Sequence, residues 1–156
     1  MLRRTSLTTL AATLVAGTVA FAASHADAPR ELKAREGLMY MQSLYLGTIA
    51  NMVRGNAEYD AEAAQTAADS LVALSEVGWD PLWPEGTSTA ELEATRALPA
   101  IWEDKEGFDA AWTNFAEAAT AMQAVAGNGL EEVQAAMGDL GRSCGGCHDD
   151  YREPDD

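Results

Sequence analysis

The chain has 156 residues, with 10 basic and 25 acidic side chains and a formal net charge of −15. Nucleic acids and anionic membrane surfaces repel a protein this acidic, so we expect neither as a partner. The length suits one domain built around a single core.

The N-terminal segment, residues 1–26, has the pattern of a cleaved secretory signal peptide. Arg3 and Arg4 supply its positive start, and residues 7–22 are uncharged and mostly apolar or small. Ser24-His25-Ala26 fits the small-x-small cleavage pattern. A membrane anchor is the alternative, but the run is short and rich in Ala and Thr for a spanning helix.

Cleavage after Ala26 would leave residues 27–156 as the mature domain, with cleavage after Ala22 as the alternative. The signal segment holds two of the ten basic residues and no acidic one, so the mature charge would be −17. His148 would be the one histidine left, because the chain has two and the other is His25. No later segment is apolar enough to span a bilayer, so we expect no membrane association after cleavage.

Helical periodicity dominates the rest of the chain, and alternating strand patterns are absent. Asp60 suits a helix N-cap, and glycines follow the ends of the helical segments. The connections at 55–59 and 127–129 are short, so each joins two antiparallel neighbours. These features predict an all-α, up-down-up-down four-helix bundle. Its helices are expected at residues 29–54, 60–77, 103–126 and 130–152.

The long connection at residues 78–102 holds three of the four Trp and three of the five Pro. A loop of this length in a compact domain is usually functional or disordered. Its tryptophans argue against disorder, so we expect a functional loop. A short helix is predicted inside it at 91–97.

Near the C-terminus the sequence reads Cys144-Gly145-Gly146-Cys147-His148. This is the pattern for covalent haem attachment, in which two thiols bond the haem and the histidine ligates its iron. A redox dithiol would follow a strand in a βαβ unit, which this region lacks. A zinc site needs about four ligands, and a disulfide across so short a loop would constrain little of the unfolded chain.

Both cysteines lie on an apolar stripe of the fourth predicted helix, and spacings of three and four residues place the members of that stripe on one face. A haem attached there would therefore lie inside the bundle, between helices. The stripe consists of Leu130, Val133, Met137, Leu140, Cys144, Cys147 and Tyr151.

With these motifs the chain resembles cytochrome c prime, the class II c-type cytochromes. The resemblance rests on Cys144 to Arg152, on Arg35-Glu36-Gly37-Leu38-Met39, and on the Leu82–Thr87 loop, whose proline sits one position early. It implies one haem c in a four-helix bundle, an architecture for which this family is a standard example.

The resemblance also assigns roles outside the haem-attachment motif. It places Arg35 and Glu36 beside the haem, with Arg35 near a propionate, and Met39 over the distal face of the iron. Tyr151 would pack near the proximal His148. Gly86 and Thr87 would contribute from the loop.

The family pattern implies a five-coordinate, high-spin haem with an apolar distal pocket. Such a pocket lacks a strong donor for bound dioxygen, so it suits nitric oxide or carbon monoxide better. We therefore expect a gas-binding and electron-transfer protein rather than an enzyme; peroxidase chemistry would lack a distal histidine. The alternative is a low-spin electron carrier with Met39 as the sixth ligand, and Met ligation raises the reduction potential.

The resemblance also implies export to the periplasm and a homodimer formed through the first two helices. Four first-helix residues could form an outward apolar stripe for that contact, or could equally be core: Leu38, Met41, Tyr45 and Met52. The acidic surface favours a redox partner with a basic patch.

Overall fold

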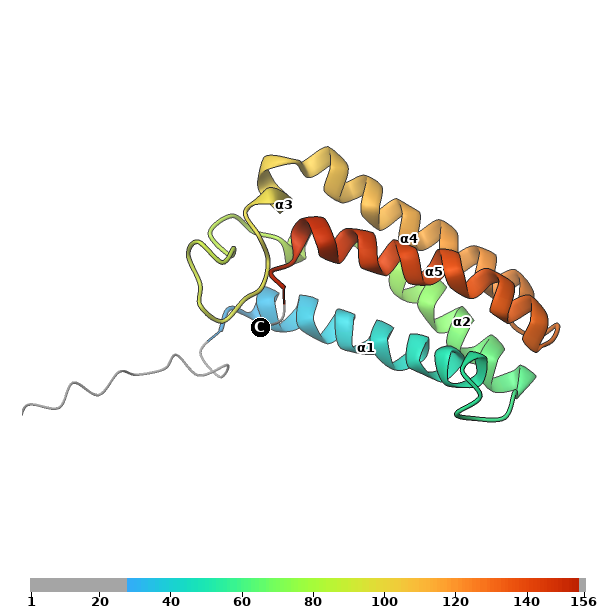
Figure 1. Ribbon diagram of the computed structural model, residues 1–156. Coiled ribbons are helices and arrows are strands. Elements are labelled where there is room, and N and C mark those ends of the chain that lie inside the picture. The colour runs from blue at the N-terminus through green and yellow to red at the C-terminus, as the bar shows by residue number, and fades with distance from the viewer. Residues whose placement is uncertain (1–27, 155–156) are drawn as a thin grey trace, which may run out of the picture.

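The computed structural model describes residues 28–154, so the predicted signal peptide at 1–26 and its cleavage sites lie outside the described residues. Four long helices form an antiparallel bundle (Figure 1). Two short helical turns lie in the long connection, and residues 28–154 contain no strand, only one isolated bridge between Ala97 and Arg152. The helices are α1 (Arg30–Val53), α2 (Ala61–Ser75), η2 (Asp80–Leu82), α3 (Ala100–Glu103), α4 (Lys105–Val125) and α5 (Leu130–Tyr151).

The predicted four-helix bundle is confirmed, and the helix ends follow from local chemistry. The Asp60 carboxylate accepts a hydrogen bond from the Ala63 amide at 3.0 Å and so caps α2. Asp104 caps α4 in the same way, through the Gly107 amide at 3.1 Å. Gly55 follows α1 with a φ of 73°, a conformation that favours glycine. The short turns place α1 beside α2 and α4 beside α5, and α2 also packs against α4.

The turn-linked half of the bundle, away from the long connection, has a closed, mostly aliphatic core, and Leu71, Phe115 and Leu140 at its border also line a cavity at the loop end. Alanines on α2 and α4 let the helices approach closely, and larger side chains fill the remaining space. None of the helices within residues 28–154 is long and apolar enough to cross a membrane. We call this core the closed core: Ile49, Met52, Ala64, Ala67, Ala68, Leu71, Phe115, Ala119, Met122, Ala126, Val133 and Leu140.

The prediction of a short helix at 91–97 is wrong, because this segment forms turns. Its backbone is paired elsewhere: Glu153 N–H donates to the Arg96 carbonyl at 2.8 Å, and Leu98 N–H donates to the Tyr151 carbonyl at 3.0 Å. The end of the segment is therefore paired with residues at and after Tyr151 rather than with its own neighbours. The connection is therefore held against the C-terminal end of α5 (Figure 1).

Candidate functional site

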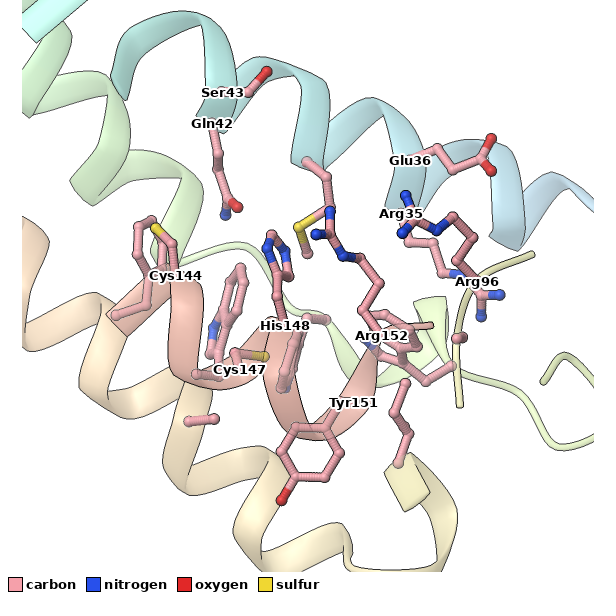
Figure 2. A pocket seen from close by; sticks show the side chains of 18 of the residues that line it. Arg35, Glu36, Gln42, Ser43, Arg96, Cys144, Cys147, His148, Tyr151 and Arg152 are labelled. Carbon is pink, nitrogen blue, oxygen red and sulfur yellow. The ribbon is translucent and has the colours of Figure 1, made fainter. Parts of the chain in front are cut away.

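A cavity of about 660 Å³ lies at the loop end of the bundle, between α1, α4, α5 and the long connection (Figure 2). That volume is in the range of small-molecule and cofactor sites. Most of the residues singled out from the sequence line it: Arg35, Glu36, Met39, Cys144, Cys147, His148 and Tyr151. Gly86 and Thr87 do not line it: Gly86 is exposed, and Thr87 is buried behind the wall.

The haem-attachment motif lies on α5, which continues as a helix through it. Cys144 and Cys147 are three residues apart, so their thiols lie on one face of α5, about one turn apart. Both are unbonded thiols, so no disulfide joins them. Burial raises the pKa of both, that of Cys147 to about 11, with the charges of Cys144 and Asp150 adding to the shift. The thiols are therefore neutral at pH 7 and face an apolar space.

Aromatic rings form the wall of the cavity on the side of α4 and the long connection. Trp79 stacks on Phe108 with ring centroids 4.4 Å apart and on Trp112 at 4.2 Å. Tyr151 meets Phe108 edge to face at 5.1 Å, as expected for paired aromatic rings. The Tyr151 hydroxyl donates to Asp104 at 3.0 Å. Burial, followed by this carboxylate, raises the pKa of Tyr151 to about 12.

Arg35 joins α1 to the long connection. Its side chain is only 3% exposed, and its guanidinium donates to the Thr87 hydroxyl at 3.0 Å, the Thr87 carbonyl at 2.8 Å and the Thr95 hydroxyl at 2.6 Å. It also lies 4.8 Å from the ring centroid of Trp83, a cation–π contact. Burial lowers the Arg35 pKa, and Glu36 opposes that shift. Arg35 and Thr87 were both assigned to the haem pocket by the family resemblance, and the structure shows that they are hydrogen-bonded to each other.

Two lining residues were missed from the sequence. Arg96 lines the cavity near Arg35, and Gln42 lines it farther along α1 (Figure 2). Arg152, which ends the C-terminal motif, also lines the cavity, and its side chain reaches toward His148. Gln42 lies three residues after Met39, so helical spacing alone could have found it. The Gln42 Nε2 and Trp83 Nε1 atoms are buried, with no hydrogen-bond partner among residues 28–154. The wall of the cavity therefore includes polar groups as well as apolar side chains.

The second stripe predicted on α1 is mostly core. Leu38 and Met52 are buried and Tyr45 is partly buried, so Met41 alone of the four is exposed. The apolar side chains that do face outward on α1 are Tyr40 (76% exposed), Leu44 (65%) and Met41 (48%).

These features fit a haem. Two neutral thiols project from one helix face into a largely aromatic and aliphatic cavity, with His148 beside them. At one end lies the buried guanidinium of Arg35, with Arg96, which suits the acidic edge of such a group. The buried unpartnered N–H groups also call for acceptors that the described protein residues do not supply.

Known proteins match this chain over nearly all the described residues. The family model for Cytochrome C' matches residues 30–152. Cytochrome c-554 from Cereibacter sphaeroides is 43% identical, over 81% of this chain and 95% of its own. Cytochrome c' from a strain of the same organism is 40% identical, over 97% of this chain and 98% of its own.

Solved structures share the fold as well as the sequence. Cytochrome c' from Rhodobacter sphaeroides has a TM-score of 0.79 at 38% identity, covering 81% of this chain and 97% of its own. A nitric oxide complex of a mutant cytochrome c prime from Alcaligenes xylosoxidans has a TM-score of 0.70 at 29% identity, covering 81% and 95%. With a family model matching most of its length, this chain belongs to the cytochrome c' family of c-type haem proteins.

Proposed function

We propose that this protein is a periplasmic cytochrome whose single haem is held by Cys144, Cys147 and His148 and keeps one coordination position open for nitric oxide or carbon monoxide. In this proposal the protein also exchanges electrons with a redox partner and does not turn over a substrate. The observation that carries it is one cavity with the haem-attachment motif on its α5 wall and no second histidine among its lining residues.

The residues have separate tasks in this proposal. Cys144 and Cys147 would bond the haem vinyl groups, and His148 would supply one axial ligand. Arg35 would hold the long connection over the cavity and present positive charge to the propionates. Tyr151 and the aromatic wall would exclude water. The haem supplies the redox and gas-binding chemistry, and the protein tunes it by ligation, burial and access.

The matched structures support gas binding. A mutant of the Alcaligenes xylosoxidans protein, at 29% identity to this chain, has been solved as a nitric oxide complex. In the present chain the α1 wall offers the thioether of Met39 and no histidine to the open side. Peroxidase chemistry would need an acid–base group there, so we expect none.

Visible spectra of the oxidised and reduced protein, with and without nitric oxide, test the open coordination position. We expect high-spin spectra and direct binding of nitric oxide and carbon monoxide. The alternative is a low-spin carrier in which Met39, a cavity-lining residue, occupies the sixth position. A sharp, split α/β pair in the reduced protein and a long-wavelength Met-to-iron band in the oxidised protein would establish that alternative.

Met39→Ala separates the two forms by a second measurement. If Met39 lines an open pocket, its removal should change carbon monoxide affinity while the spin state stays high. If Met39 ligates the iron, its removal should convert a low-spin protein to a high-spin one. An unchanged affinity and spectrum would mean that Met39 does not contact the ligand side.

Export and assembly are part of the same proposal. The signal pattern in residues 1–26 supports a periplasmic location, where haem c attachment takes place in the proteins this chain resembles. The exposed Tyr40, Met41 and Leu44 on α1 support a homodimer through this face. Sedimentation should show a dimer for the unmodified protein and a monomer for Leu44→Glu. The redox partner is expected to carry a basic patch.

A further inference from the structure

Gln42 is a buried donor facing the cavity. Its Nε2 atom is shielded from solvent and has no hydrogen-bond partner among residues 28–154. Native proteins pair nearly all such groups, because an unpaired buried N–H loses its bonds to water without replacement. The acceptor for Gln42 is therefore expected to come from whatever fills the cavity.

The position of Gln42 on α1 narrows what that acceptor can be. Arg35, Met39 and Gln42 follow one another at spacings of four and three, so they share one face of the helix. Gln42 lies seven residues from Arg35, about 10 Å along the axis at 1.5 Å per residue. Figure 2 shows Gln42 directed toward the region of Cys144 and His148, whereas Arg35 and Arg96 lie at the other end and the Arg152 side chain reaches toward His148.

A haem in this cavity would bring two kinds of acceptor. Its carboxylates would be drawn to the end with Arg35 and Arg96, because charge-assisted hydrogen bonds to guanidinium are stronger than those to a neutral amide. Gln42 lies away from that end. The acceptor left for it is a small ligand on the open side, the side that Met39 also lines.

We propose that the side-chain amide of Gln42 donates a hydrogen bond to a diatomic ligand held in the cavity, and so determines which gas is retained longest. This inference rests on the proposed gas-binding function. The donor favours ligands that carry more negative charge on the outer atom. Gln42 thus gives this chain a polar contact that the apolar pocket implied by the sequence resemblance does not include.

The test compares Gln42→Leu with Ser43→Ala in the full chain, exported and loaded with haem. In Gln42→Leu the C–O stretching frequency of bound carbon monoxide should rise, and dissociation should be about three- to tenfold faster, the value of one net hydrogen bond. Ser43 also lines the cavity, but its hydroxyl already donates to the Tyr40 carbonyl at 2.8 Å, so Ser43→Ala should change neither value.

The third measurement is the melting temperature of the ligand-free protein, which should increase in Gln42→Leu although gas retention decreases. Without added ligand, Gln42→Leu should melt at a higher temperature than the unmodified protein, because the unpaired buried amide is gone. A residue with only a packing role would not weaken gas retention while stabilising the ligand-free protein. Gln42→Met, which is also apolar and close in length, gives the same comparison if Gln42→Leu does not fold.

The outcomes separate this inference from the function on which it rests. If carbon monoxide binds and neither the frequency nor the dissociation rate moves in Gln42→Leu and Gln42→Met, the role of Gln42 is overturned alone. If the unmodified protein binds no carbon monoxide, both the open coordination position and the role of Gln42 are overturned.

Discussion

The two ends of the bundle use the same four helices in opposite ways. At the turn-linked end the helices meet through the closed core, where Val133, Met122 and Ala119 are fully buried. At the loop end they stay apart around a cavity of about 660 Å³, and aromatic rings with a buried arginine line the gap. The closed core therefore supplies stability from the chain alone, whereas the loop end depends on the group that fills it.

The largest expected effect is on the loop end. Replacing both Cys144 and Cys147 by Ser should abolish covalent haem, because no other cysteine is present in the chain. Acid–acetone extraction of the exported protein measures the effect. Haem that stays with the polypeptide after extraction would contradict the attachment proposal. The closed core should keep helical circular dichroism in this variant, and its loss would show that the two ends are not separable.

The next effect belongs to the closed core. Met122 is fully buried and lies outside the cavity, so Met122→Ala should lower the free energy of unfolding by about 2–5 kcal/mol through lost burial and an unfilled void. Thr120→Ala, at an exposed position on the same helix, is the control and should stay within about 0.5 kcal/mol. Chemical denaturation measures both, and equal losses would mean that the core is not the main source of stability.

At the loop end, the Arg35 contacts predict a smaller loss. Thr95→Val removes the acceptor of the Ala97 N–H and one acceptor of the buried Arg35 guanidinium, and the second loss alone should cost about 1.5–3 kcal/mol, the range for hydrogen bonds to charged groups. The long connection should also become more sensitive to limited proteolysis at residues 84–97. Thr113→Val on the exposed face of α4 is the matched control. An unchanged proteolysis rate would show that Arg35 does not hold the connection in place.

The smallest effect compares the two aspartate caps, one at each end. Asp60→Ala removes a single capping bond and should cost about 1 kcal/mol. Asp104→Ala should cost about 2 kcal/mol, because Asp104 caps α4 and also accepts from the Tyr151 hydroxyl. Tyr151→Phe in the Asp104→Ala background should then be nearly neutral. Equal losses at the two caps would mean that the Tyr151 contact contributes nothing.

Local patterns were enough to predict the helices, because caps, glycine turns and three-to-four spacing act within a few residues of the chain. The prediction failed at 91–97, where Arg96 and Leu98 pair with the chain around Tyr151 rather than with their own neighbours. The prediction of the outward apolar stripe on α1 was also incomplete. Leu38 and Met52 belong to the core, whereas Tyr40 and Leu44 face outward. Both outcomes depend on partners that lie far away in the sequence.

Residue type and spacing along single segments were enough to specify the four helices and to place Cys144, Cys147 and His148 on one of them. The packing of the helices and the long connection brings Arg35 to Thr87 and Thr95, more than fifty residues away, and buries the amide of Gln42 against the same cavity. Burial and hydrogen-bond pairing are properties of packed segments, so a single segment does not reveal which polar group is left without an acceptor.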